Sequence, residues 1–193
     1  MKLRFLLLGI GLTIFGSGLA HAQSTVAIEL NVENQLRRVV IKLHEDKAPN
    51  TCKNFRAKAS GRNYVGLAVH RAIPNYIVQM GDPYTSDETQ RHLWGTGGGD
   101  ETIPAELGLP VKRGSVAMAR LPDSRNPSKA SNGSQFFVAL NDLESLDGQY
   151  TVFGQVVNGI EHLDYVADRN VDTNDAPLQR SEIASTTVTG ADG

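Results

Sequence analysis

Cysteine is almost absent from this 193-residue chain, because Cys52 is the only one. No intramolecular disulfide can form, so the fold must be held together by packing alone. Cys52 falls among the apolar positions of a predicted helix, and we interpret it as a small buried hydrophobic residue and not as a catalytic thiol. The five histidines show no metal-ligand spacing with this cysteine. The sequence therefore predicts no metal site and no cofactor.

The chain also lacks an excess of charge of either sign. Nineteen basic and 21 acidic residues give a formal net charge of -2 at pH 7. Binding to nucleic acid or to an anionic membrane normally requires a clustered positive charge. The composition therefore excludes both as expected partners.

Long apolar runs are missing except at the beginning of the chain. Lys2 and Arg4 precede an apolar stretch, and Ala20-His21-Ala22 has the small-x-small pattern of a signal peptidase site. An uncleaved anchor is the alternative, but the run is short for the roughly 20 residues that a bilayer span needs. Residues 1–22 are thus a predicted secretory signal peptide of bacterial type. We expect the remainder, 23–193, to be one domain that is periplasmic or secreted, without stable membrane insertion after cleavage.

Alternating apolar residues predict most of the secondary structure as strands. Residues 25–32 and 39–43 read as a hairpin, and later strands are expected at 114–119, 136–140, 150–157 and 183–188. A helix is predicted to open near Pro49 and to end at Gly61, and a second to begin with Asn158 as its cap and Glu161 three residues later. The pattern indicates an all-β fold, either a barrel or a sandwich, with helices over its open ends.

Residues 83–109 lose this periodicity and are predicted to be a long surface connection that is anchored by Leu93 and Trp94. The glycine-rich run at 95–99 could suggest a phosphate cradle. It lacks the Lys-Ser/Thr pair that would follow, so we favour glycines that form turns.

The stretch from Val69 to Asp82 carries the most distinctive chemistry. It interleaves Arg71, Tyr76 and Gln79 with apolar residues and contains no obvious nucleophile. Taken alone, Arg71 would be read as a surface ion-pair partner of Asp82 or Glu101. A secreted hydrolase is not supported, because no Ser, His and carboxylate stand in a recognisable motif.

Four motifs occur in one order: HRAIPNYIVQMGD at 70–82, SVAMAR at 115–120, NGSQFF at 132–137 and LDGQYTVFG at 146–154. Together they resemble the cyclophilin-type peptidyl-prolyl cis-trans isomerases, in register from about Val26 to Val188. The resemblance implies a closed eight-stranded antiparallel barrel capped by two α-helices. It also implies a monomer that needs no cofactor and acts on proline-containing peptides and unfolded protein clients.

The resemblance assigns roles to individual positions. The catalytic arginine falls on Arg71, with Gln79 and Tyr76 beside it. The remaining positions of the expected peptide site are Ile73, Ile77, Ala119, Arg120, Gln135, Phe137, Leu146 and Tyr150. Arg120 is expected to act through its backbone. Strand alternation should send Phe136 to the core and Phe137 to the groove. It should also point His70 inward, and we interpret this residue as a core histidine whose hydrogen bonds are satisfied.

These residue types suit rotation about an Xaa-Pro bond. The barrier is about 18 to 20 kcal/mol because the peptide bond has partial double-bond character. At the twisted transition state the proline nitrogen gains a lone pair, which a fixed cationic donor such as Arg71 can stabilise. A peptide-binding chaperone module with little turnover is the alternative. Such a module could dispense with the arginine that this chain keeps.

The sequence departs from many family members at the edge of the pocket. Ser145 stands where many have Trp, and Tyr76 and Tyr150 stand where many have Phe and His. Loss of an indole removes a large flat contact and an N–H donor. We therefore expect weak inhibition by cyclosporin-like macrocycles with isomerase activity retained, and nanomolar inhibition of the purified protein would contradict this.

Overall fold

The structure is a computed structural model that describes residues 23–98 and 101–190. The predicted signal peptide at 1–22 lies outside the described residues. Within the described ranges, no helix has the length and apolar character to cross a membrane.

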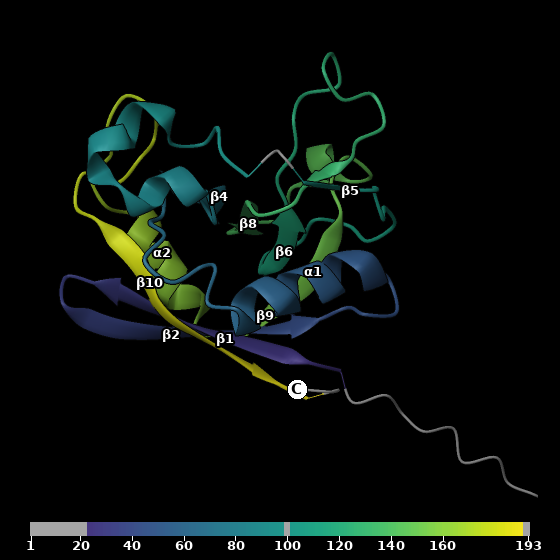
Figure 1. Cartoon of the computed structure of the whole chain (residues 1–193), viewed down its shortest axis with the longest axis horizontal. Helices are drawn as coiled ribbons and strands as arrows, with labels where there is room; N and C mark the ends of the chain where they lie inside the picture. The colour runs from purple at the N-terminus through teal and green to yellow at the C-terminus, as the bar shows by residue number, and fades with distance from the viewer. Residues whose placement is uncertain (1–22, 99–100, 191–193) are drawn as a thin grey trace, which may run out of the picture.

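An eight-stranded antiparallel sheet forms the body of the protein (Figure 1). Its strands, in spatial order, are β10 (Ser181–Thr189), β1 (Thr25–Val32), β2 (Gln35–Leu43), β9 (Val152–Asn158), β6 (Ser115–Met118), β8 (Phe136–Ala139), β4 (Ile77–Met80) and β3 (Arg71–Ile73). A separate two-stranded ladder pairs β5 (Thr102–Ile103) with β7 (Ser131–Asn132). The predicted strands are confirmed, with ends that shift by at most four residues.

The first hairpin shows why the sequence forms this sheet. Val26, Ile28, Leu30 and Val32 alternate along β1, and all four are buried. Their partners on β2 follow the same register, with Val26 opposite Ile41 and Ile28 opposite Val39. The turn between the strands places Glu33 and Asn34 at positive φ, a conformation that suits a tight hairpin turn. One apolar face is thereby directed inward along both strands.

The two ends of the sheet approach each other through the segment before β3. Ala68 forms an isolated antiparallel bridge with Glu182 of β10. Three backbone hydrogen bonds of 2.8 to 2.9 Å join this segment to β10: Gly66 N to Ile183 O, Val69 N to Ser181 O, and Ile183 N to Leu67 O. Eight strands in one strongly curved sheet are therefore established.

Two α-helices cover the sheet, as predicted. Helix α1 (Pro49–Ser60) has proline in its first turn and Gly61 at its C-cap, and its buried residues include Cys52, Phe55 and Ala59. The Cys52 thiol donates to the Phe153 carbonyl at 3.3 Å, and burial raises its pKa to about 12. The interpretation of Cys52 as a buried hydrophobic residue is confirmed.

Helix α2 (Ile160–Ala167) has a different N-terminus from the one predicted. Gly159, with φ of 85°, is the N-cap and offers no side chain, whereas Asn158 is the last residue of β9. The predicted Asn158–Glu161 capping box is therefore wrong. A Cβ at Gly159 would lie 2.1 Å from the Arg38 carbonyl oxygen, so the close approach to β2 requires glycine here.

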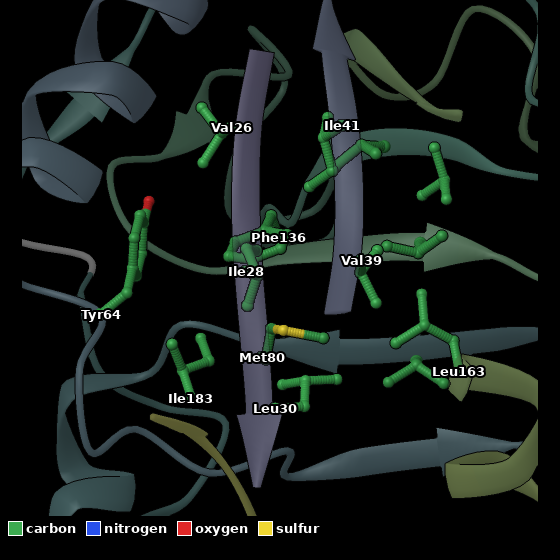
Figure 2. Packing of buried hydrophobic residues seen from close by; sticks show 14 of the residues in the cluster. Val26, Ile28, Leu30, Val39, Ile41, Tyr64, Met80, Phe136, Leu163 and Ile183 are labelled. Carbon is green, nitrogen blue, oxygen red and sulfur yellow. The ribbon is translucent and has the colours of Figure 1, made fainter. Parts of the chain in front are cut away.

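The main core lies between the curved sheet and its helices. Figure 2 shows Val26, Ile28 and Leu30 along β1 beside Val39 and Ile41, with Phe136 and Met80 behind them. Phe55 is central to the aromatic part, because its ring centroid lies 4.8 to 5.4 Å from those of Tyr64, Phe136 and Phe153. This cluster supplies the apolar burial that a protein without disulfides requires.

The long connection after β4 is compact. It contains the 3-10 helices η1 (Pro83–Ser86) and η2 (Glu88–Leu93), which begin at the side-chain caps Asp82 and Asp87. Within the connection, the Trp94 indole N–H donates to the Asp87 carbonyl and the Arg91 guanidinium lies over the ring. Trp94 also contacts a residue outside it, because the Arg180 guanidinium lies 5.8 Å from its ring centroid, whereas Leu93 is only partly buried. A further 3-10 helix, η3 (Glu144–Leu146), follows β8.

Candidate functional site

Strand register places three of the predicted site residues in one row on the outer face of the sheet. Arg71 of β3 lies opposite Gln79 of β4, Gln79 lies opposite Phe137 of β8, and Phe137 lies opposite Ala117 of β6. Because side chains of paired residues project to the same face, residues up to 66 positions apart are brought together. The row crosses four neighbouring strands and forms the base of a cavity.

The cavity above this row has a volume of about 330 Å³. Its lining includes six of the predicted positions on the base and near wall: Arg71, Tyr76, Ile77, Gln79, Phe137 and Leu146. Ala119, Arg120 and Tyr150 line it as well. The cavity combines an apolar floor with many polar side chains around it, and a small concave pocket is the usual form of a ligand site.

Aromatic packing fixes the floor of the cavity. The Phe137 and Tyr150 rings meet edge to face, with centroids 5.3 Å apart and an interplanar angle of 89°. Phe137 belongs to a small apolar cluster with Ile77 and Val152, on the opposite side of β8 from Phe136. The prediction that the two adjacent phenylalanines separate between core and groove is confirmed.

Arg71 stands at the rim of this floor. Its side chain is 41% exposed, and its Nε lies 3.5 Å from Oδ2 of Asp175. The two ion-pair partners considered from the sequence are engaged elsewhere: Asp82 is buried in a loop, and Glu101 lies 3.5 Å from Lys58. Among the described residues, neither Nη of Arg71 makes a hydrogen bond, so both donors are available to the cavity.

Gln79 is oriented by a second amide. Its Nε2 donates to Oε1 of Gln135 at 2.8 Å. Gln135 is only 3% exposed, and its Nε2 donates to the carbonyls of Gly95 and Gly97. The Gln135 side chain therefore has its donors and acceptor occupied, and it fixes the Gln79 amide from behind.

A buried carboxylate organises the glycine-rich run. Asp82 accepts hydrogen bonds from the backbone N–H groups of Tyr84 at 2.8 Å and Gly97 at 3.0 Å, and also from Gly95. A Cβ at Gly97 would lie 2.2 Å from Asp82 Oδ1, so glycine is required at this position. The N–H groups that a phosphate would need already bind Asp82. The interpretation of the run as turn-forming glycine is thus supported.

Arg120 and Ala119 form the opposite wall. The Arg120 guanidinium is 7% exposed, donates from Nε to the Gln149 carbonyl at 2.6 Å, and lies 5.0 Å from the Tyr150 ring centroid. Its backbone N–H and C=O make no hydrogen bond within the described part of the chain. The Ala119 N–H and C=O bind Gln135 and Asn132 instead. This contrast agrees with the expected backbone role of Arg120.

A second cavity of about 580 Å³ continues the groove past Gln79 and Ala119. Gln135 lines this second cavity and not the first. Ile73 lies on β3 beside the row, is half-buried, and is absent from the lining of both groove cavities. Gln135 therefore belongs to the second cavity, whereas Ile73 lies beside the groove without lining either cavity.

Part of the wall was not predicted from the sequence. His70, Arg91, His92, Trp94, Gly95, Asp172, Asn174 and Ala176 also line the first cavity. His70 is 5% exposed and therefore buried as expected, but it lines this cavity and neither ring nitrogen has a hydrogen-bond partner among the described residues, so it is not a satisfied core histidine. Burial lowers its pKa to about 4, and the nearby Asp82 carboxylate opposes this only in part. The other residues come from two aperiodic segments, for which polar composition was the only signal.

Within the described ranges, no group of three or more His, Cys, Asp or Glu side chains is arranged to hold a metal ion. Histidine and aspartate side chains lie in the wall, but no Ser, Cys, Thr or Lys is among the described residues that line the first cavity, so the usual nucleophiles of covalent catalysis are missing from it. Its chemistry is that of positioned hydrogen-bond donors above an apolar floor.

Comparison with known proteins identifies the family of this chain. Residues 27–188 match the family described as cyclophilin type peptidyl-prolyl cis-trans isomerase. Peptidyl-prolyl cis-trans isomerase B of Saccharomyces cerevisiae is 37% identical over 163 residues, which cover 79% of this chain and 73% of that protein. Peptidyl-prolyl cis-trans isomerase CYP65 of Arabidopsis thaliana is 37% identical over 148 residues, which are 77% of this chain but only 24% of that longer protein.

Solved structures show the same fold. A crystal structure of a Cryptosporidium parvum cyclophilin type peptidyl-prolyl cis-trans isomerase aligns with a TM-score of 0.74 at 27% identity, over 89% of this chain and 100% of that one. A structure of that protein in the presence of the dipeptide Ala-Pro gives 0.72 at 28% identity, over 86% and 99%. The family match, the curated relative and the shared fold together establish that this chain belongs to the cyclophilin-type peptidyl-prolyl cis-trans isomerases.

Proposed function

We propose that this protein accelerates cis–trans isomerisation of Xaa-Pro bonds in unfolded protein clients, with Arg71 as the catalytic group. The observation that carries the proposal is the aligned row of Arg71, Gln79 and Phe137. It places an unsatisfied cationic donor at the rim of a small aromatic pocket. The parasite relative studied with Ala-Pro supports proline as the group that the pocket receives.

Each part of the row has a separate task in this mechanism. Phe137, Ile77, Leu146 and the half-exposed rings of Tyr76 and Tyr150 hold the pyrrolidine ring, so that the chain on the other side of the bond can turn. The fixed Gln79 amide and the free Arg120 backbone hold main-chain groups of the peptide. These contacts orient the bond before it rotates.

Arg71 stabilises the twisted state selectively. In the planar amide the lone pair of the proline nitrogen is delocalised and does not accept a hydrogen bond. Rotation removes this conjugation, so the nitrogen of the twisted state can accept one. A charge-assisted bond of this kind, together with orientation, can lower the barrier by about 4 kcal/mol, roughly a thousandfold in rate. No covalent bond between the substrate and the protein forms or breaks.

Replacement of Arg71 by alanine tests this mechanism. We expect kcat/KM for an Ala-Pro peptide to fall by about a hundredfold or more, because the fixed donor is lost. Arg38→Ala is a matched control, since Arg38 is also a strand arginine in a single exposed ion pair, with Glu29. The control should retain wild-type activity.

Two outcomes would contradict the proposal. A wild-type protein that does not accelerate the reaction would favour a peptide-binding chaperone module. An Arg71→Ala variant as fast as wild type would show that the mechanism is wrong even if the activity is real.

We also propose that the curved sheet closes as a barrel. The bridge at Ala68 and the three backbone bonds from residues 66–69 to β10 support closure. Amide hydrogen exchange tests it, because the Ile183 N–H should be as protected as the amides in the centre of β1. Rapid exchange of that amide would indicate an open sheet.

For location, we propose export of a monomer to the periplasm or the medium of a bacterium. The support is the residue pattern at 1–22, which would leave Gln23 as the first residue. The relatives compared above are eukaryotic, so they give no information about a bacterial source. N-terminal sequencing of the mature protein and its size by gel filtration are the tests, and retention of Lys2 would contradict cleavage.

A further inference from the structure

Two segments that are distant in sequence form one wall beside Arg71. The 3-10 helices at 83–93 pack against the loop between α2 and β10, residues 168–180. In Figure 1 these are the teal helices and the yellow loop that lie together at one side of the molecule. Arg91 joins them, because its Nε lies 3.0 Å from Asp172 Oδ2 and its Nη2 donates to the Pro177 carbonyl at 2.7 Å.

Arg180 joins the two segments a second time. Its Nη2 donates to the carbonyls of Thr85 at 2.9 Å and Gly66 at 2.7 Å, and its Nη1 lies 2.9 Å from Glu88. The Trp94 ring lies near both guanidinium groups, 4.7 Å from that of Arg91 and 5.8 Å from that of Arg180. Several charge-assisted bonds therefore hold this loop in one position.

Asp172, Asn174 and Ala176 of this loop line the cavity, and Asp175 is the loop residue that contacts Arg71. It has φ of 62°, a left-handed conformation that aspartate tolerates better than most residues. Its carbonyl accepts a hydrogen bond from Ala72 N at 2.8 Å, and its N–H donates to the Asp172 carbonyl at 3.1 Å. Strained backbone of this kind persists where the surrounding contacts over-determine it, and it is common at active sites.

The same residue contacts β3 a second time through its side chain. Asp175 Oδ2 lies 3.5 Å from Arg71 Nε, next to the main-chain contact at Ala72. Arginine presents five donors in one rigid plane, so a contact at Nε constrains the direction of both Nη groups. Those Nη groups have no other partner among the described residues and belong to the cavity lining.

We propose that Asp175 is a positioning residue that holds the Arg71 guanidinium in the orientation required for isomerisation. This inference rests on the proposed function of Arg71. Asp175 is not a catalytic residue, because its carboxylate contacts Arg71 and is absent from the cavity lining. The 41% and 45% exposure of the two side chains means that solvent screens the charge of the pair, so its main contribution is orientation.

Asp175→Gly is the direct test. Glycine keeps the left-handed backbone and the carbonyl contact to Ala72, and removes only the carboxylate. We expect the rate of isomerisation on the enzyme to fall about three- to fivefold, the effect of a half-exposed ion pair, with peptide affinity changed less than twofold. NMR exchange measurements on an Ala-Pro peptide give both quantities.

Two further variants separate orientation from charge and from folding. Asp175→Asn keeps an acceptor oxygen and tolerates positive φ, so it should recover most of the activity. Asp168→Asn changes an acid near the same loop that makes no ion pair among the described residues, so it should match wild type. Loss of activity in Asp175→Asn equal to that in Asp175→Gly would overturn an orienting role.

A double substitution tests whether Asp175 acts through Arg71. In an Arg71→Ala background, Asp175→Gly should cause no further loss, because its target is gone. An equal further loss would show a merely structural role and overturn the inference. The Arg71 Nε–H signal gives a readout that does not depend on activity, and its exchange with water should be faster in Asp175→Gly than in wild type.

The outcomes distinguish the two proposals. Wild type without isomerase activity overturns the proposed function and, with it, the role of Asp175. Active wild type that loses activity in Arg71→Ala but not in Asp175→Gly overturns only the inference about Asp175.

Discussion

Two apolar clusters lie on opposite sides of β8 and differ in how far their aromatic side chains are exposed. The cluster around Phe136 is closed, and its aromatic members Phe55, Tyr64, Phe136 and Phe153 are each 0% exposed. The cluster around Phe137 is small, and its outer members, which include Tyr76, Leu146 and Tyr150, are only partly buried. The aromatic centre of the first cluster is shielded from solvent, whereas the second leaves aromatic surface at the cavity that a ligand can cover. Neighbouring residues of one strand thus serve stability and binding separately.

Phe136→Ala should have the largest effect on stability. The ring is fully buried and contacts Phe55 at 5.1 Å and Tyr64 at 5.4 Å between centroids, so its loss leaves a cavity that the core cannot fill. We expect the free energy of unfolding to fall by about 3 to 5 kcal/mol. Urea denaturation measures this. Activity per folded molecule should stay near wild type, and a selective loss of activity would break the distinction between the clusters.

Phe137→Ala should reduce activity more than it reduces stability. Its ring borders an existing cavity, so we expect a smaller loss of about 2 kcal/mol in the free energy of unfolding. Loss of the proline contact should lower kcat/KM by about ten- to a hundredfold. The same denaturation and peptide assays give both numbers. If Phe137→Ala destabilises as strongly as Phe136→Ala while activity persists, the second cluster is ordinary core.

His70, which lines the first cavity, provides a test with a smaller expected effect on stability that depends on pH. Its pKa is about 4 in the folded protein and 6.5 when unperturbed, chiefly because of burial, with Asp82 and Arg71 as the nearby charges. As the pH falls from 6.5 to 4, the unfolded chain binds a proton that the folded protein does not. Stability should therefore fall across this window, by at most about 3 kcal/mol.

A comparison of wild type with His70→Gln isolates this contribution. Glutamine does not titrate, so the stability of the variant should depend less steeply on pH between 6.5 and 4. Carboxylates contribute equally to both proteins and cancel in the difference. Parallel profiles would show that His70 is protonated in the folded state and that its burial is less complete than the structure indicates.

Sequence periodicity correctly predicted the strands and helices that bury one apolar face. Val26 to Val32 alternate, and Cys52, Phe55 and Ala59 recur at helical spacing, so burial of these positions follows from local geometry. The N-terminus of α2 was predicted incorrectly at Asn158. The close approach of Gly159 to Arg38 of β2, a tertiary constraint, overrides the local capping preference.

The site residues also fall into a group that the sequence predicted and a group that it did not. Arg71, Gln79 and Phe137 were identified from motifs, and regular strand register explains why they align. Asp172 and Asp175 were not identified, since their contacts with Arg91 and Arg71 span 81 and 104 positions between segments without periodicity. Such pairings depend on how loops fold over the sheet, and no local pattern records them.

The contacts that cover the outermost strands of the sheet, β10 and β3, bear on how the protein behaves beside unfolded chains. Residues 66–69 bind the open side of β10, and the Asp175 carbonyl binds β3 at Ala72. An exposed strand edge is a template on which an unfolded chain can add as a further strand and aggregate. At these edges the described chain covers that template. An unfolded chain that meets these covered edges cannot add there as a further strand.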